Sequence, residues 1–305
     1  MNSASVIELG RPAIRRPSPL LRYFQGRLRG SEFTWAVAFV VPYIGVFLAF
    51  VVYPVIYGAW MGSDPRLYTE LFSDPIYQQT VVNTLIFLAF GVNLKLFLAL
   101  MMSGFFMQPG WWMKALLLIF VLPWAIPALP TFISIHWMLN GEWGLLNNTL
   151  YILFGIEGPS WLNERWLALG SAICAHIWKW LPFWTVILLA GRMSISRDII
   201  DAAKVDGATG LRCFLHVTFP LLANLYLTLT LLATIFLLGD FNSVSFVTGG
   251  GPANTTHVLA TLGIRNAYEM GKPELGVAAV MSALPLMIPL VIILMRKLRT
   301  TAVTL

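Results

Sequence analysis

Six long apolar runs constrain the fold of this 305-residue chain more than any other feature of its sequence. They fall at roughly residues 34–60, 80–106, 115–139, 166–190, 221–243 and 275–295, and a helix needs about 20 apolar residues to cross a bilayer. Charged residues make up only 11% of the chain, against roughly a quarter in soluble domains. Only helices and closed barrels satisfy the backbone in lipid, and these runs are too long for barrel strands. The sequence therefore predicts an all-α membrane protein with six transmembrane helices.

The basic residues predict the side of the membrane on which each loop lies, because Lys and Arg are enriched on the cytoplasmic side. With the N-terminus inside, only Arg66, Arg165, Arg265 and Lys272 fall outside. The expected cytoplasmic set is Arg11, Arg15, Arg16, Arg22, Arg27, Arg29, Lys114, Arg192, Arg197, Lys204, Arg212, Arg296, Lys297 and Arg299. Both termini and the 191–220 loop are therefore expected in the cytoplasm. This topology explains the net charge of +6 without a nucleic-acid partner.

The same topology divides the chain into three parts. Residues 1–33 are expected to form a basic cytoplasmic tail that contacts anionic membrane lipid. Residues 34–298 form the six-helix transmembrane domain, and residues 299–305 form a short C-terminal tail.

The motifs of common enzyme classes are missing from the sequence. It holds no G-x-x-x-x-G-K-[ST] phosphate-binding loop, no H-E-x-x-H and no G-x-S-x-G. The histidines His136, His176, His216 and His257 fall in different segments, which does not favour a shared metal site. We therefore expect no catalytic residue, metal or cofactor in this chain, which leaves transport or signal relay.

Residues 201–220, in the predicted 191–220 loop, carry the most informative pattern. Asp198 can cap a helix and Asp201 would lie in its first turn, where the helix dipole favours an acid. Gly207 permits a turn, a second amphipathic helix follows, and Pro220 predicts a break before the fifth membrane helix. From these residues alone, a helix lying on lipid and a docking surface for another protein are about equally supported.

This segment also resembles the EAA loop of permease subunits from binding-protein-dependent ABC importers. The family pattern is Glu-Ala-Ala, three residues, Gly, nine residues, Ile, one residue and Leu-Pro. The matching residues here are Asp201-Ala202-Ala203, Gly207, Val217 and Phe219-Pro220. Residues 71–75, 83–85, 122–127 and 180–184 resemble further segments of carbohydrate-type permeases. The Thr-Gly-Gly-Gly-Pro sequence at 248–252 is similar to a loop in the first, maltose-permease-F-like, subunit of maltose- and glycerol-phosphate-type importers.

The resemblance implies a type I ABC importer permease fold in the bacterial cytoplasmic (inner) membrane. It implies a non-catalytic subunit that forms a pathway for a sugar or related polyol together with a second permease. Two copies of an ABC ATPase would bind ATP and magnesium, and a periplasmic or lipid-anchored binding protein would deliver the substrate. The residues implied in coupling to the ATPase are Asp201, Ala202, Ala203, Asp206, Gly207, Ala208, Phe214 and Pro220.

Charged residues within a membrane are costly and mark candidate functional sites, and Lys95, Lys179 and Asp240 lie in the apolar runs. Lys179 shares one helical face with a histidine and two aromatic residues, a combination that suits a sugar. The resemblance implies a substrate pathway formed by His176, Lys179, Trp180, Phe183, Phe236, Leu237, Asp240 and Phe241. A structural alternative is a Lys179–Asp240 ion pair, or snorkelling of either charge. Lys95 is expected to pack or to contact a partner.

Two other functions stay open on the sequence. An ATP-independent carrier or channel would be expected to show inverted internal repeats, and none is visible. A multi-pass membrane enzyme would need buried His, Lys and Asp side chains gathered in one place.

Overall fold

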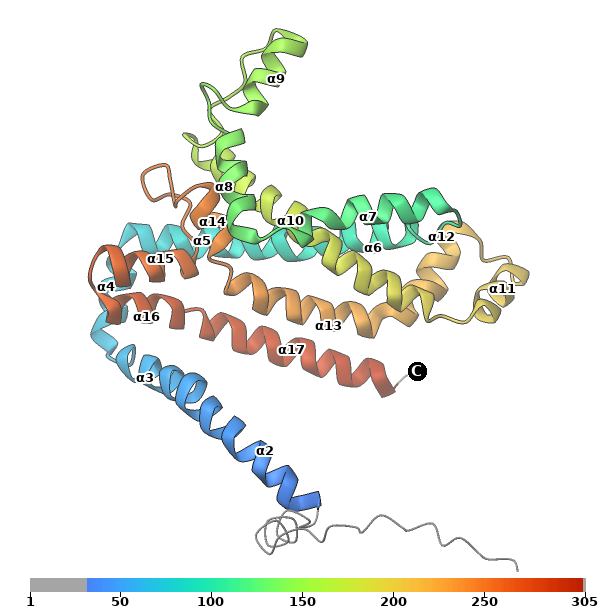
Figure 1. The fold of residues 1–305 in the computed structure, drawn as a ribbon, viewed down its shortest axis with the longest axis horizontal. Coiled ribbons are helices and arrows are strands. Elements are labelled where there is room, and N and C mark those ends of the chain that lie inside the picture. The colour runs from blue at the N-terminus through green and yellow to red at the C-terminus, as the bar shows by residue number, and fades with distance from the viewer. Residues whose placement is uncertain (1–31, 304–305) are drawn as a thin grey trace, which may run out of the picture. The chain divides into compact units, whose positions relative to one another are not determined.

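The structure is a computed structural model that describes residues 32–303 (Figure 1). Over this range the regular structure is entirely helical, with no β-strand, and short π-helical segments (labelled η) interrupt the longer helices. The all-α class predicted from the sequence is therefore confirmed. The chain divides into two compact units, one ending at Trp60 and the other beginning at Met61. The predicted basic tail, residues 1–33, lies outside the described residues except for its last two positions.

The first unit contains one long apolar helix. Its segments are α2 (Glu32–Phe47), η1 (Leu48–Val52) and α3 (Tyr53–Met61). The stretch Val37–Met61 is long and apolar enough to cross a membrane. Its aromatic side chains are exposed, and Phe50 is the most exposed of them at 77%. Apolar surface of this kind in a single chain is suited to contact with lipid or with another protein.

The second unit begins with a short helix and a second long one. The segments are α4 (Pro65–Ser73), α5 (Pro75–Leu88), η2 (Ala89–Leu94) and α6 (Lys95–Phe105). Asp74 caps α5 by accepting a 2.9 Å hydrogen bond from the backbone N–H of Ile76, and Pro75 takes the first helical position, which needs no N–H donor. From Pro75 to Phe105 the chain is helical over 31 residues.

The third apolar run is bent. Helices α7 (Trp111–Ala125) and α8 (Ala128–Met138) meet at 93°. Ile126 is extended between them because Pro127 disfavours a helical conformation at the residue before it. A short apolar helix, α9 (Leu145–Phe154), ends at Gly155 in the left-handed conformation, a common helix C-cap.

Helix α10 (Arg165–Met193) is the helix around which the second unit is packed. It is 29 residues long and contacts α6 most extensively, and also α7 and α13 (Figure 1). Small side chains make this close packing possible, since Ala168 and Ala172 have no exposed surface.

The chain after α10 forms a short helix and another long one. The segments are α11 (Arg197–Val205), α12 (Gly210–Cys213), η3 (Phe214–Thr218) and α13 (Phe219–Leu238). The last three form one apolar helix, Gly210–Leu238. The predicted break at Pro220 is therefore wrong, and the predicted second surface helix is the first part of this long one. Pro220 follows a π segment, one of the local adjustments that accommodate proline within membrane helices.

The remaining segments are α14 (Asn242–Val247), α15 (Leu259–Ile264), η4 (Arg265–Glu269), α16 (Pro273–Met281) and α17 (Leu284–Val303). The described part of the chain holds four helices long and apolar enough to cross a membrane, or five if α7 and α8 form one bent span. They correspond to the first five predicted runs. The sixth run is divided between α16 and α17, and a sixth span stays a prediction. Helix α17 continues to Val303, past the predicted domain boundary at residue 298.

Candidate functional site

A cavity of about 310 Å³ lies beside the middle of α10 and the end of α13. Its lining is Lys95, His176, Trp180, Phe183, Trp184, Phe236, Gly239, Asp240 and Asn242. The residues from α10 recur at helical spacing, so they share one face of that helix. A few polar groups set in an aromatic wall are typical of small-molecule sites, whose volumes begin at roughly 300 Å³.

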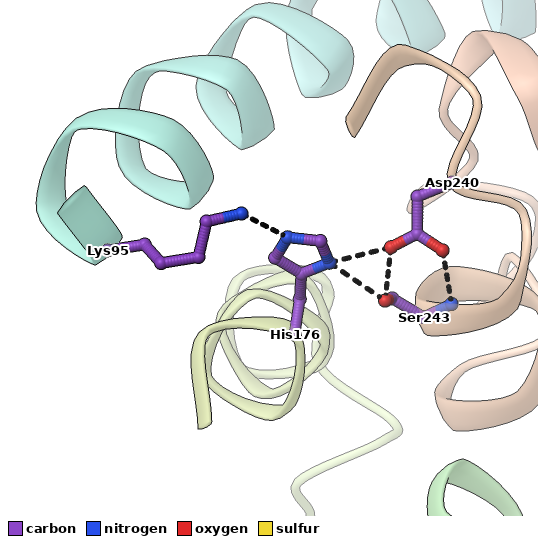
Figure 2. Close-up of polar contacts among 4 residues, drawn as sticks. All are labelled: Lys95, His176, Asp240 and Ser243. Atoms are coloured by element: carbon purple, nitrogen blue, oxygen red, sulfur yellow. Dashed lines mark hydrogen bonds and ion pairs between the residues drawn. The ribbon is translucent and has the colours of Figure 1, made fainter. Parts of the chain in front are cut away.

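The amino group of Lys95 forms one end of a polar chain in this cavity (Figure 2). Lys95 begins α6 and is only 2% exposed. Its Nζ lies 3.0 Å from Nε2 of His176 and 5.5 Å from the centre of a Trp184 ring. Because a lysine ammonium can only donate hydrogen bonds, Nε2 of His176 is the acceptor.

The other ring nitrogen of His176 continues the chain to Asp240 (Figure 2). His176 Nδ1 lies 2.6 Å from Asp240 Oδ2 and 3.1 Å from Ser243 Oγ. Since Nε2 accepts from Lys95, the proton of the neutral ring is on Nδ1, which donates to the carboxylate. The result is a directed series of hydrogen bonds from Lys95 through His176 to Asp240.

Asp240 is positioned by the turn between α13 and α14. It follows Gly239, where α13 ends, and its Oδ1 accepts a 3.2 Å hydrogen bond from the backbone N–H of Ser243. The Ser243 hydroxyl also donates to Asp240 Oδ2. A carboxylate that accepts from the first backbone N–H groups of a helix is held in place as a helix cap is. Asp240 therefore presents a fixed carboxylate to α10.

Lys179 lies elsewhere and does not line the cavity. It is 1% exposed, and its ammonium donates to the carbonyl oxygens of Pro123 (2.7 Å), Trp124 (3.4 Å) and Ile126. These carbonyls lie at the end of α7, where a helix leaves acceptors unsatisfied and its dipole favours a cation. Lys179 therefore stabilises the bend between α7 and α8. The alternative Lys179–Asp240 ion pair does not form, because the carboxylate is paired with His176 instead.

The structure brings together five of the eight residues implied in the substrate pathway. They are His176, Trp180, Phe183, Phe236 and Asp240. Leu237 is 5% exposed and packs in the core, and Phe241 lies against Phe246, with their ring centres 5.9 Å apart. Both are absent from the lining.

The lining also includes residues outside the predicted substrate pathway, namely Lys95, Trp184, Gly239 and Asn242. Trp184 could have been predicted from helical spacing, because it follows His176 by two helical turns and so lies on the same face of the helix. Lys95 was a candidate functional residue because it is a charged residue within a membrane segment. Nothing in the sequence, however, indicated that its helix packs against the helix of His176.

The predicted coupling segment contains an exposed helix, α11. Ser196 caps it, since its Oγ accepts from the backbone N–H of Asp198 at 3.3 Å. The predicted cap at Asp198 is therefore wrong, and Asp198 lies in the first turn, where the helix dipole still favours it. Asp201 accepts a 2.7 Å hydrogen bond from Lys204, and both side chains are exposed. This bond and the Lys204 charge hold the pKa of Asp201 below its ordinary value.

The surface of this segment is uneven. Five of the residues implied in coupling are exposed, namely Asp201, Ala202, Asp206, Gly207 and Pro220. Ala203 is buried, and Ala208 and Phe214 are partly buried. The guanidinium of Arg192 lies 5.1 Å from the Phe214 ring centre and donates to Ser103 Oγ at 2.8 Å, which ties this segment to α6. The backbone of Gly207 is left-handed, with φ of 81°, and a Cβ there would meet nothing within 4 Å.

Two of the family-like segments meet at the other end of the unit. Asn83 of α5 is fully buried, and its Nδ2 donates to the backbone oxygens of Thr255 (2.8 Å) and His257 (3.0 Å). Its Oδ1 accepts from Arg165 at 3.1 Å. Asn83 therefore fixes the loop that follows residues 248–252 against α5 and the start of α10.

His257 fills the inside of that loop. Gly250 has φ of 79°, and a Cβ on it would lie 2.1 Å from the His257 ring. The ring nitrogens lie 3.1 Å from Thr261 Oγ1 and 3.2 Å from Asn254 Oδ1. Burial, together with the charge of Arg265, lowers the pKa of His257 to about 4. The loop is thus built around a neutral histidine.

Comparison with known proteins identifies the family. A family model described as a binding-protein-dependent transport system inner membrane component matches residues 95–299. The chain is 34% identical over 196 residues to the sulfoquinovosyl glycerol transport system permease protein SmoG of Agrobacterium fabrum. That match covers 63% of this chain and 62% of SmoG. It is 29% identical to the trehalose/maltose transport system permease protein MalF of Thermococcus litoralis, over 83% of this chain and 89% of that protein.

A solved structure shares the fold. A chain in the crystal structure of a bacterial alginate ABC transporter, in complex with an alginate pentasaccharide-bound periplasmic protein, superposes with a TM-score of 0.78 at 20% identity. The superposition covers 90% of this chain and 96% of that chain. With the match over residues 95–299, these findings show that the chain belongs to the family of inner membrane components of binding-protein-dependent transport systems.

Proposed function

We propose that this chain is one of two permease subunits of an ABC importer that moves a sugar or a related polyol across the bacterial cytoplasmic membrane. The observation that carries the proposal is the cavity between α10 and the end of α13, with its aromatic wall and its polar chain. Aromatic rings cover the apolar faces of a sugar, and the polar groups bond its hydroxyls. The names of SmoG and MalF, which specify sugar derivatives and disaccharides, support a cargo of this class.

The proposed arrangement in the membrane has six spans and both termini in the cytoplasm. Helices α16 and α17 together would make the sixth span. The distribution of Lys and Arg supports the orientation, including the cluster of Arg296, Lys297 and Arg299 near the C-terminus.

The remaining subunits would supply energy and substrate. Two ABC ATPases would bind ATP and magnesium and dock on α11 and the turn after it, where the exposed Val205 (87%) and Gly207, beside which there is open space, offer a surface for a partner. A binding protein would deliver the sugar from outside. The alginate transporter that shares this fold was solved with such a protein bound, which supports this partner. This chain would itself be non-catalytic.

The test is reconstitution of the chain in proteoliposomes with its second permease, ATPase and binding protein. We expect labelled sugar to accumulate only when ATP is enclosed with the ATPase, and not with an ATPase variant that cannot hydrolyse ATP. Accumulation without ATP would instead support an ATP-independent carrier. Co-purification with the ATPase through detergent extraction gives an independent check of the proposed assembly.

A further inference from the structure

Lys95 is a buried lysine that lacks a direct counter-ion among the described residues. A lysine ammonium has three N–H donors, and within the described part of the chain His176 Nε2 is its one hydrogen-bond partner. No carboxylate among the described residues lies within ion-pair distance of its Nζ. Buried charges are normally paired, because removing a charge from water is costly. Two donors of Lys95 thus remain for another group.

Asp240 does not supply that group, although it lines the same cavity. Its carboxylate accepts from His176 Nδ1, from the backbone N–H of Ser243 and from the Ser243 hydroxyl. Its side chain is only 9% exposed. Both residues line the cavity, but the Asp240 carboxylate accepts three hydrogen bonds, whereas the Lys95 amino group has one hydrogen-bond partner among the described residues.

Lys179 is a buried lysine whose hydrogen-bond donors all have partners within this chain. It donates to three carbonyl oxygens at the end of α7 and takes no part in the lining. The contrast makes Lys95 the cation available to a molecule in the cavity. The Trp180, Phe183 and Phe236 rings would cover the rest of such a molecule.

We propose that Lys95 is a specificity-determining residue of the cavity, and that it binds an anionic substituent, such as a carboxylate, sulfonate or phosphate, on the transported sugar. This inference rests on the proposed function of a sugar importer and names its substrate class. A charged acceptor suits Lys95 better than a hydroxyl, because two opposite charges attract each other strongly where the local dielectric constant is low. It would also provide the counter-ion that the chain lacks.

The test compares matched sugars in the reconstituted complete importer. The binding protein is first screened by thermal shift against sugar pairs that differ only in one group, a hydroxymethyl against a carboxylate, or a hydroxyl against a sulfonate or phosphate. ATP-driven uptake of the sugars that it binds is then measured for the wild type and for Lys95→Met, Lys95→Arg and Lys114→Met. Lys114 is exposed near the start of α7 and serves as the matched control for loss of a lysine.

We expect Lys95→Met to lower kcat/KM for the anionic sugar by about tenfold or more, equivalent to about 1.4 kcal/mol. Lys95→Arg, which keeps the charge, should retain most of the uptake, and Lys114→Met all of it. Uptake of a neutral partner sugar should change little. If Lys95→Met does not insert, Lys95→Gln replaces it, because an amide still donates to His176 without a charge.

Three results would separate the ways in which the inference can fail. An importer that accepts only neutral sugars overturns the role of Lys95 but leaves the proposed function intact. An equal loss for charged and neutral sugars, or no loss, shows that Lys95 is structural or unnecessary. An absence of ATP-driven uptake of any sugar overturns the proposed function, and this inference with it.

Discussion

Replacement of Gly207 by tryptophan tests whether the loop after α11 receives a force-generating partner. Gly207 has φ of 81°, and a Cβ built on it meets nothing within 4 Å. A tryptophan there would therefore not clash within this chain. It would cost about 1–2 kcal/mol for a left-handed conformation, and its indole would project from the exposed surface beside Val205 and Asp206.

Gly155 provides a matched control for that cost. It has φ of 65° and also meets nothing within 4 Å, but it caps α9 in the predicted external loop. Gly155→Trp and Gly207→Trp should thus lose similar stability, about 1–2 kcal/mol each. A third variant, Gly207→Asn, keeps a residue that tolerates the left-handed conformation and adds little bulk.

The assay is ATP-driven sugar uptake by the reconstituted importer, with ATPase activity measured in parallel. We expect Gly207→Trp to lower the rate of sugar uptake by about tenfold or more while ATP hydrolysis continues. A tenfold loss corresponds to about 1.4 kcal/mol of free energy no longer coupled to transport. Gly155→Trp and Gly207→Asn should transport nearly as well as the wild type. If Gly207→Trp transports as well as Gly155→Trp, the loop is not a docking surface and the coupling assignment is wrong.

The remaining predictions address packing and pH. Lys179→Met should leave carbonyl oxygens at the α7–α8 bend without hydrogen-bond donors, which should cost on the order of 3 kcal/mol of stability. The unfolding temperature should therefore fall, while KM for the sugar should stay unchanged. A changed KM would return Lys179 to the substrate pathway. Because the pKa of His257 is lowered from 6.5 to about 4, the unfolded chain takes up this proton first, so the loop's stability is full above pH 6.5 and declines as the pH falls toward 4. The protection factors of the loop amides, which are corrected for the intrinsic pH dependence of hydrogen exchange, should fall over that window, and His257→Gln should remove this fall. An unchanged profile in the variant contradicts the role of the histidine. Gly250→Ala should lower the unfolding temperature more than Gly249→Ala, since both glycines have positive φ but only the Gly250 Cβ would meet the His257 ring, at 2.1 Å. Equal effects would mean that the ring can move aside.

The fold was predictable where it depends on composition and helix length. Four of the six apolar runs match helices long and apolar enough to cross a membrane, and a fifth matches the bent pair of α7 and α8, because run length and polarity alone decide this. Pro220 shows the limit of local rules. A proline is expected to break a helix, but a π segment, η3, precedes it and the helix continues to Leu238.

The site was predictable only as far as one helix determines it. Helical spacing placed His176, Trp180 and Phe183 on one face, and they do line one cavity. The same spacing added Lys179, which lies at a slightly different angle on the helix and reaches the end of α7. Which helix faces His176 is a tertiary property, so the contact with Lys95, 81 positions away in the sequence, could not be inferred.

The unbroken helix from Gly210 to Leu238 has a mechanical consequence. At 1.5 Å per residue its 29 residues form a rod about 43 Å long. One end of the rod begins three residues after Gly207, and the other ends two residues before Asp240. Helix α10 makes a similar link from His176 to Met193, three residues before the Ser196 cap of α11. A displacement of the loop would therefore be transmitted along both helices to Asp240 and His176, and could change the distance between these two side chains.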